Sequence, residues 1–227
     1  MLLLISGASG VGKSTARQLI QDRLGEQVEA VELVDLAPFP TAPAPHWRQE
    51  TAEKAARRAV RLKGEGRHLL LAGDPVVPGE ILATPSARHL DIAICLLDAD
   101  ENTQTARLRE RGDPEELLPH HLAFADWLRH HARDPQHMLH VITGSGWDRM
   151  QWSRLRGIRA GDPRWRIPVI DSTGLSKENA ANRALRWATR ALARDEPIFD
   201  AGWYRHRRAD PSMSAHRVTT RRSGPPR

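Results

Sequence analysis

Short apolar stretches alternate with longer amphipathic segments along most of the chain. The apolar stretches are nearly continuous, which is typical of strands buried on both faces of a sheet. The segments between them place apolar residues three and four positions apart, as in a helix. This alternation predicts an α/β fold, a parallel sheet with helices on both faces. The expected strands are residues 2–5, 28–35, 67–72, 91–97 and 166–171, and the main expected helices are 16–24, 46–63, 101–111 and 176–194.

A glycine-rich turn joins the first expected strand to the first expected helix. Its pattern, Gly7-x4-Gly12-Lys13-Ser14, is that of the phosphate-binding loop called Walker A. Glycines allow positive φ angles, so successive backbone N–H groups can point into one concavity, to which the helix N-terminus adds partial positive charge. Lys13 would reach the β- and γ-phosphates, and the Ser14 hydroxyl would hold Mg²⁺. The predicted nucleotide site comprises Gly7, Ala8, Ser9, Gly10, Val11, Gly12, Lys13, Ser14 and Thr15.

Two of the expected strands end in a carboxylate. Asp35 closes the second strand, and Asp74 follows the third. Ligands of parallel sheets bind beyond the carboxyl ends of the strands, so both acids are expected at the edge that carries the glycine-rich turn. Asp35 can act as a general base or an anchor for a hydroxyl group, or else as a helix cap or turn residue. Asp74 can hold Mg²⁺ through water, as in a Walker B strand, or form a turn before Pro75.

The composition is that of a soluble, globular domain. Of the 227 residues, 40% are hydrophobic and 27% are charged. No apolar run approaches the roughly 20 residues that span a membrane, and the apolar start lacks the basic flank of a secretory signal. The one cysteine, Cys95, lies in an apolar run and is interpreted as a core residue. We therefore expect a cytoplasmic protein with no membrane partner.

The net charge of +6 is concentrated near the C-terminus. After Asp195, seven arginines stand against three acidic residues, which gives +4 to this segment and leaves +2 for the rest of the chain. Proline, serine, arginine and glycine dominate there without periodicity, so residues 196–227 are expected to form a poorly ordered basic tail. Because the excess charge lies mostly in this tail and no nucleic-acid motif is present, a nucleic-acid partner is not favoured.

Residues 113–166 interrupt the alternation of strands and helices. They contain four of the seven tryptophans and six of the eleven histidines. The histidine pairs are adjacent and no cysteine accompanies them, so a zinc site is less favoured than a polar helix face or a substrate-facing lid. Tryptophans usually serve packing, although one or two here could stack on a flat acceptor. One cluster of arginines in this segment fits either an acidic or phosphorylated ligand or a plain surface: Arg149, Arg154, Arg156 and Arg159.

Three motifs together carry a family resemblance. They are the loop at residues 7–15, Leu96-Leu-Asp-Ala-Asp followed by Arg107-Leu-Arg-Glu-Arg-Gly112, and Ile170-Asp-Ser-Thr-Gly-Leu175. With them the chain resembles the small P-loop kinases, which include nucleoside monophosphate, shikimate and gluconate kinases and chloramphenicol phosphotransferase. The resemblance spans residues 1–195 and implies a three-layer P-loop NTPase fold with a five-stranded parallel sheet of order 2-3-1-4-5. Residues 113–166 would then be a helical lid or substrate insertion.

The same resemblance implies roles for individual residues. Arg107 and Arg111 match arginines of a lid that closes over the phosphates, and they lie one helical turn apart. Residues 171–174 match a loop that touches the adenine, and Asp35 matches an acid that orients or deprotonates the acceptor hydroxyl. The insertion is longer and richer in tryptophan than a usual lid, so the resemblance implies no particular acceptor.

These features predict an ATP-dependent kinase that transfers the γ-phosphate, with Mg²⁺, to a small-molecule acceptor. Nucleoside-, sugar- and antibiotic-like acceptors all stay open. Lys13, Asp35, Arg107 and Arg111 would be catalytic, and Ser14 and Asp74 would hold the metal. The alternative is a nucleotide-binding regulatory ATPase that uses its basic tail to bind a nucleic acid or a protein. A GTPase is less favoured, since the chain has no Asn-Lys-x-Asp guanine signature.

Overall fold

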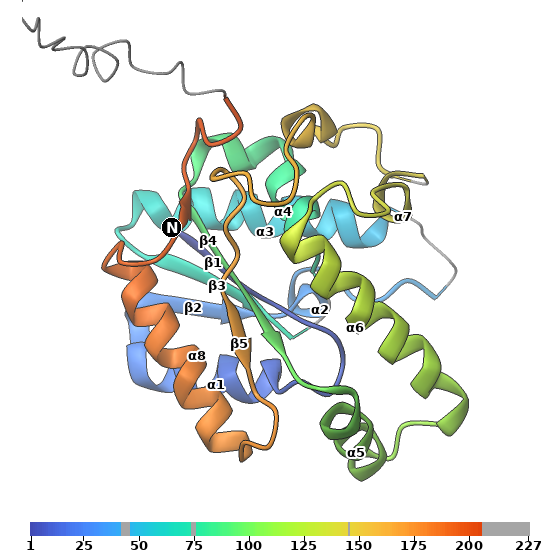
Figure 1. The fold of residues 1–227 in the computed structure, drawn as a ribbon. Helices are drawn as coiled ribbons and strands as arrows, with labels where there is room; N and C mark the ends of the chain where they lie inside the picture. Colours follow the sequence, from blue (N-terminus) through green and yellow to red (C-terminus); the bar gives the residue numbers. More distant parts are fainter. Residues whose placement is uncertain (42–45, 74–75, 145, 206–227) are drawn as a thin grey trace, which may run out of the picture.

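A twisted sheet of mainly parallel strands forms the centre of the molecule (Figure 1). The computed structural model describes residues 1–41, 46–73, 76–144 and 146–205. The five parallel strands stand in the order β2-β3-β1-β4-β5, and a sixth strand, β6, pairs with β4 in the antiparallel direction. The prediction of five strands was therefore one strand short. The strands are β1 Leu2–Ser6, β2 Val28–Val31, β3 His68–Ala72, β4 Ile92–Asp98, β5 Val169–Asp171 and β6 Ile198–Phe199.

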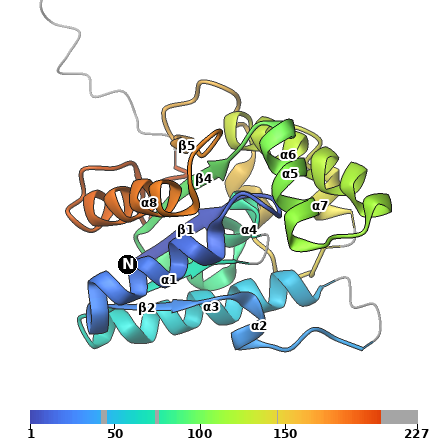
Figure 2. The same ribbon diagram turned by 90° about the horizontal axis from the view of Figure 1, so that it is seen from below.

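Helices cover both faces of the sheet. On one face α1 (Lys13–Leu24) lies beside α8 (Lys177–Leu192), as Figure 2 shows from below. The other face is covered by α3 (Trp47–Gly64) and α4 (Pro78–Ala83). The remaining helices are α2 Leu33–Leu36, α5 Glu101–Arg111, α6 Leu118–Arg133 and α7 His140–Thr143, with 3-10 turns at Gly25–Gln27, Pro85–His89, Glu115–Leu117 and Trp152–Leu155.

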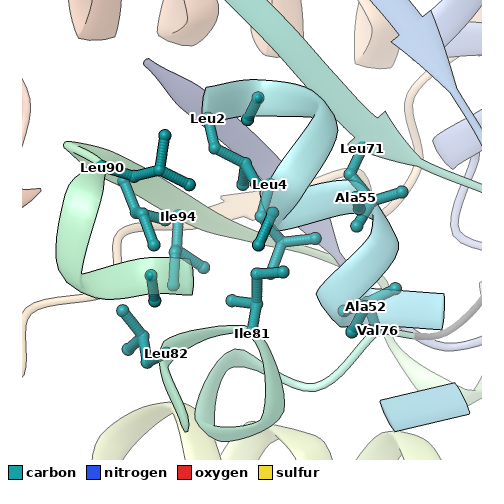
Figure 3. Close-up of a cluster of buried hydrophobic side chains, with 14 of the residues drawn as sticks. Leu2, Leu4, Ala52, Ala55, Leu71, Val76, Ile81, Leu82, Leu90 and Ile94 are labelled. Atoms are coloured by element: carbon teal, nitrogen blue, oxygen red, sulfur yellow. The ribbon is translucent and has the colours of Figure 1, made fainter. Parts of the chain in front are cut away.

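The central strand β1 divides the core into two layers. Successive side chains of a strand point to opposite faces, so an internal strand covered on both sides must be apolar throughout. Leu2 and Leu4 pack with α3 and α4, whereas Leu3 and Ile5 pack with α1 and α8. Figure 3 shows the first of these layers. Burial of each such leucine contributes about 1.5–3 kcal/mol, and it fixes β1 between β3 and β4, with the glycine-rich loop at its carboxyl end.

Residues 113–166, expected to form a lid or substrate insertion, are in large part built into the core. Trp127 on α6 packs in a cluster with Leu96 of β4, and Trp165 is also buried. The buried Arg154 side chain donates hydrogen bonds to the carbonyls of Leu82 at 2.9 Å and Thr84 at 2.7 Å, where α4 ends. A helix end needs such donors because its last carbonyls have no partner within the helix. Arg154 therefore fits neither of the two alternatives, an acidic ligand or a plain surface, because it is buried and supports the fold.

Residues 196–205, expected to begin a poorly ordered tail, belong to the folded domain. Phe199 in β6 is 3% exposed, and its ring lies 5.8 Å from that of Trp165 and 5.1 Å from that of Trp203. The expected boundary at Glu196 is therefore wrong, because a short strand with one buried aromatic residue has no periodicity to recognise. The rest of the predicted tail, residues 206–227, lies outside the described residues. Over the described ranges, no helix has both the length and the apolar character that crossing a membrane requires.

Candidate functional site

The loop between β1 and α1 has the backbone conformation that its glycines allow. Gly10 and Gly12 have φ angles of 84° and 103°, which lie in the left-handed region, and Gly12 is the N-cap of α1. A Cβ atom at Gly7 would stand 2.4 Å from the carbonyl oxygen of Leu97, so only glycine fits against β4 there. A Cβ atom at Gly12 would meet nothing within 4 Å, which shows open space in front of the helix N-terminus. The loop therefore forms the open cradle that a phosphate group requires.

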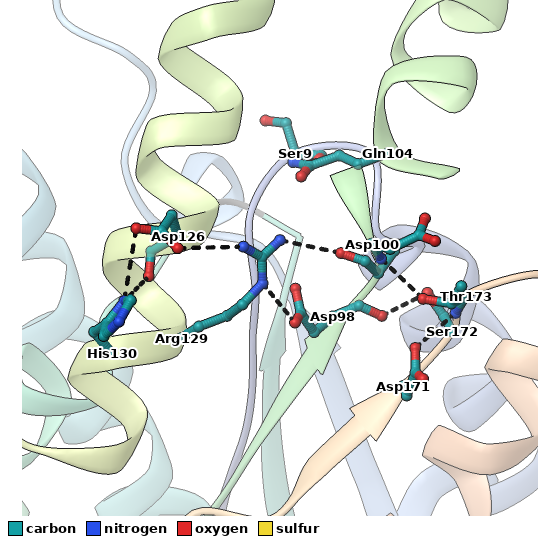
Figure 4. A network of polar contacts seen from close by, with 11 residues as sticks. Ser9, Asp98, Asp100, Gln104, Asp126, Arg129, His130, Asp171, Ser172 and Thr173 are labelled. Atoms are coloured by element: carbon teal, nitrogen blue, oxygen red, sulfur yellow. Dashed lines mark hydrogen bonds and ion pairs between the residues drawn. The ribbon is translucent and has the colours of Figure 1, made fainter. Parts of the chain in front are cut away.

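Buried polar contacts hold this cradle from behind. The Gln104 side chain on α5 is fully buried and donates to the carbonyl of Ser9 at 2.8 Å. The Ser172 hydroxyl, just after β5, donates to the carbonyl of Asp98 at 2.8 Å and lies 3.3 Å from that of Val11. Figure 4 shows Gln104 beside Ser9, and Ser172 beside Asp98 at the carboxyl ends of β4 and β5. These bonds to carbonyls fix the backbone of the loop in its open conformation.

A cavity of about 470 Å³ opens in front of the loop. Four cationic side chains and two carboxylates line it, so its charge suits a polyphosphate. The volume falls within the range of about 300–1,000 Å³ that small-molecule sites occupy. The lining consists of residues 9–15 together with Glu32, Gly73, Arg107, Glu110, Arg111, Lys177 and Ala180.

Lys13 and Ser14 stand at the N-terminus of α1, as the motif predicts. Lys13 is only 5% exposed and donates to the carbonyl of Ala8 at 2.6 Å, so its ammonium group is held across the loop. Ser14 and Thr15 are exposed and line the cavity. The structure thus brings the predicted lysine and hydroxyl residues together at one helix terminus.

The two predicted arginines both line the cavity but have different partners. Arg107 donates to the Ser172 hydroxyl and carbonyl, each at 2.9 Å, and to the carbonyl of Leu175 at 3.0 Å. Arg111 forms a two-pronged ion pair with Asp113, with Nε at 2.5 Å from Oδ1, and this hydrogen bonding lowers the pKa of Asp113. The hydrogen-bond partners that fix Arg107 are therefore neutral, whereas Arg111 is held by a carboxylate, Asp113.

Asp35 does not line the cavity and instead caps a helix. Its carboxylate accepts a hydrogen bond from the backbone N–H of Glu32 at 2.8 Å, as half of a capping box at the start of α2. Glu32 lines the cavity in its place, and its Oε1 accepts from Arg17 Nε at 3.1 Å. The expected strand 28–35 was too long: β2 ends at Val31, so the first acid beyond the strand is Glu32. The alternative of a helix cap for Asp35, which the sequence left open, is the one that the structure shows.

Only one of the two residues predicted to hold a metal ion can be placed in the cavity. Ser14 lines the cavity, whereas Asp74 lies outside the described residues. Within the part of the chain that is described, no group of three or more His, Cys, Asp and Glu side chains could hold a metal ion, the histidines of residues 113–166 included. His131 is fully buried, its Nε2 accepts from the backbone N–H of Gly79 at 3.2 Å, and its ring stacks on Trp127. This histidine serves packing.

The far end of the cavity includes residues that the motifs did not indicate. The lining at α8 comes from Lys177 and Ala180, and residues 171–174, expected to contact an adenine, are not part of it. Lys177 Nζ lies 3.2 Å from Glu110 Oε1, an exposed ion pair between α8 and α5 at the edge of the cavity. No sequence pattern identifies Glu110 and Lys177 as neighbours, because each is a single charged residue on a different helix.

A salt bridge fastens α6 to the same edge of the sheet. Arg129 donates to the Asp98 carboxylate at 2.8 Å and to the carbonyl of Ala99 at 3.1 Å, at the end of β4 (Figure 4). Asp100 caps α5 by accepting from the N–H of Thr103 at 2.7 Å, and this hydrogen bonding lowers the pKa of Asp100. The acids after β4 are therefore committed to structural contacts.

Comparison with known proteins adds information about the fold. The structure is similar to the crystal structure of a sugar kinase from Janibacter sp. HTCC2649, with 17% identity and a TM-score of 0.50, over 85% of this chain and 96% of that one. It is also similar to a gluconokinase from Sinorhizobium meliloti 1021, with 17% identity and a TM-score of 0.46, over 85% of this chain and 95% of the other.

These likenesses have a definite limit. No family model matches the sequence, and no curated protein matches it either. At 17% identity the sugar kinase shows a shared fold and nothing of its reaction, and the gluconokinase likeness is too weak to carry an argument. The chain thus shares a mainly parallel α/β fold with that sugar kinase, and its chemistry must be argued from its own residues.

Proposed function

We propose that this protein is a phosphotransferase that moves the γ-phosphoryl group of ATP to a small-molecule acceptor with the help of Mg²⁺. One observation carries the proposal: the Walker A loop opens into a cavity of about 470 Å³ whose lining contains Lys13, Arg107, Arg111 and Lys177. Phosphoryl transfer depends mainly on positioning and on neutralising charge, and these residues supply both. The shared fold with a sugar kinase is consistent with this reaction class.

Binding of the triphosphate would rest on α1 and the loop before it. The backbone N–H groups around Gly10 and Gly12, together with the first turn of α1, offer donors and partial positive charge to phosphate oxygens. Lys13 would contact the β- and γ-phosphates from its place across the loop. This arrangement would hold the triphosphate without any contact to the base.

The residues at the cavity also suit Mg²⁺. The ion prefers oxygen ligands and keeps several of its waters, so it needs only one or two protein groups. The Ser14 hydroxyl, which lines the cavity, would hold it directly. When bound, the metal would neutralise charge on the β- and γ-phosphate oxygens.

Glu32 is the residue best placed to orient the acceptor. Its carboxylate lines the cavity, and Arg17 and the capping box of α2 both hold it. The side chain packs so closely over Gly73 that a Cβ atom there would stand 2.2 Å from Glu32 Cδ. A carboxylate fixed in this way can accept a hydrogen bond from an acceptor hydroxyl and take up its proton during transfer.

The arginines would stabilise the charge that develops on the transferred group. Arg107 reaches the cavity from α5 and has neutral hydrogen-bond partners, so it need not give up an ion pair to bind phosphate oxygens. Arg111 would have to exchange its carboxylate partner, Asp113, for a phosphate. We therefore assign the larger electrostatic role to Arg107.

ADP release tests the proposal against the regulatory alternative. The full-length protein with Mg·ATP is assayed against nucleosides, sugars, small metabolites and aminoglycosides. The proposal predicts that at least one acceptor class raises ADP release well above the rate without acceptor. A protein that binds Mg·ATP but releases ADP at the background rate with every acceptor would favour the regulatory nucleotide-binding protein.

A further inference from the structure

A second hollow opens at the edge of the sheet opposite the phosphate loop. Its volume is about 740 Å³, against about 470 Å³ for the candidate nucleotide cavity. It lies beside β6, which pairs Phe199 with Ile92 at the amino end of β4, whereas the loop follows the carboxyl end of β1. Figure 1 shows the two regions at opposite ends of the sheet. A ligand in this hollow would therefore not compete with a nucleotide.

The wall of the hollow is a fixed structure. Arg164 donates to both oxygens of Asp162, at 2.9 and 2.6 Å, and to the carbonyl of Tyr204 at 3.1 Å. A two-pronged arginine–carboxylate pair has a well-defined geometry. These contacts join residues 162–164 to the segment that follows β6, and they compensate the charge of Arg164.

An aromatic surface forms another part of the wall. Phe199 and Trp203 both line the hollow, and their rings meet edge to face at 5.1 Å. Phe199 is anchored by the buried Trp165, and Trp203 is half-buried. Aromatic side chains supported from behind present a flat apolar face with little loss of conformational entropy on binding.

Two further arginines give the hollow its positive charge. Arg166 and Arg205 line it, and within the described residues neither has a carboxylate in ion-pair range. Asp200, the other acid of the lining, accepts from the N–H of Gly202 at 2.8 Å. Guanidinium groups bind carboxylate and phosphate oxygens in pairs of parallel hydrogen bonds, which suits an anion placed between them.

We infer that this hollow binds a small organic anion, a carboxylate or phosphate attached to a flat ring, independently of the nucleotide. The two arginines would hold the anionic group, and the ring would lie against Trp203. The composition of residues 206–227 does not suit this positively charged hollow, because they carry six arginines and one aspartate. The inference rests on this hollow alone and does not depend on the proposed phosphotransferase activity.

A fluorescent probe of matching chemistry tests the inference. Anilinonaphthalene sulfonate, a ring system with one anionic group, is titrated into the full-length protein, first without nucleotide and then with Mg·ATP added. We expect saturable binding that benzoate and inorganic phosphate displace at higher concentration. The double variant Arg166→Ala/Arg205→Ala should weaken the Kd by about tenfold or more, since it removes both anion-binding groups.

The control is a second double variant, Arg156→Ala/Arg159→Ala. Both of these arginines are exposed, lie in the same region of the sequence and do not line the hollow. This control removes the same net charge as Arg166→Ala/Arg205→Ala, so the long-range attraction of the protein for an anion falls by a similar amount in both. The Kd of the probe for the control should nevertheless stay within about twofold of the native value. Equal loss in both double variants, no loss in the first, or displacement of the probe by ATP would each overturn the inference.

Discussion

The carboxylate of Asp35 accepts a hydrogen bond from the backbone N–H of Glu32 at 2.8 Å. This contact closes the capping box of α2 and leaves the side chain of Glu32 to line the cavity in front of the phosphate loop. The two acids are three residues apart and share one capping box, yet only Glu32 also lines the candidate site. Their substitution should therefore have different effects.

Glu32→Gln should lower kcat by about 10²–10⁴, the range for loss of a general base, with nucleotide affinity nearly unchanged. The amide keeps the size of the side chain and can still accept within the capping box. Asp35→Asn is the matched control and should leave kcat within about twofold, because Asp35 does not line the cavity. Steady-state kinetics with the best acceptor provides the measurement. A larger loss of kcat in Asp35→Asn than in Glu32→Gln would restore Asp35 as the catalytic base.

Gly73→Ala should reduce turnover as well as stability. Gly73 has a φ of 124°, and its new methyl group would stand 2.2 Å from Glu32 Cδ, so the carboxylate must move. Gly66→Ala is the control, since its φ of 73° is also left-handed but nothing lies within 4 Å. The control should lose about 1–2 kcal/mol of unfolding free energy and keep its kcat. Equal kcat values in the two variants would show that the position of Glu32 is unimportant.

Removal of the chain after Asp195 should lower the melting temperature by about 10 °C or more. Such a truncation deletes β6 and the buried ring of Phe199, and loss of a buried phenylalanine costs about 3–5 kcal/mol. Phe199→Ala in the full-length chain isolates the contribution of the ring. Arg205→Ala, an exposed change in the same segment, should leave the melting temperature nearly constant. An unchanged melting temperature in the truncated chain would contradict the packing described for residues 196–205.

His131 should make the protein less stable in acid. Burial lowers the pKa of His131 to about 3 in the folded state, with a smaller contribution from His137. In the unfolded chain the pKa of His131 is near 6.5. Below that pH its side chain therefore binds a proton in the unfolded chain but not in the folded protein. The contribution of His131 to the unfolding free energy is complete above about pH 6.5. It falls by up to about 1.4 kcal/mol per pH unit as the pH drops from there towards 3.

His131→Gln tests this dependence because glutamine can still accept from the Gly79 N–H while it cannot take up a proton. Its unfolding free energy should change less between pH 6.5 and pH 4.5 than that of the native protein. His130→Gln, a change at a half-exposed neighbour, should keep the native slope. Urea titrations across this range provide the measurement, and parallel slopes for all three proteins would refute the assignment.

Prediction from sequence worked best where local chemistry determines structure. Residues 7–15 require glycine for the turn, lysine and serine at the helix start, and a buried strand before it, so loop and helix were recognisable together. The apolar runs at β1 and β4 likewise indicated internal strands, since both faces are covered.

Prediction failed where one residue's role depends on distant contacts. Arg154 resembled a ligand-binding residue, but its partners are carbonyls about 70 positions away in the sequence. Glu32 was missed because the strand was predicted to end at Asp35, four residues beyond its actual end at Val31. The apolar pattern determines the ends of strands poorly. The pairing of Glu110 with Lys177 depends on how α5 and α8 are placed by the sheet, which no local pattern encodes.

Nucleotide affinity of the native protein and of Lys13→Ala, measured by isothermal titration calorimetry with Mg·ATP, tests the central claim most directly. Lys13 spans the phosphate loop and donates to Ala8 at 2.6 Å, so thermal denaturation must first show that the variant is folded. We predict that the native chain binds Mg·ATP and that the folded variant binds it at least about tenfold more weakly and shows no acceptor-dependent ADP release. Equal affinity in the two proteins, or no binding by the native chain, would contradict the assignment of this cavity to a nucleotide.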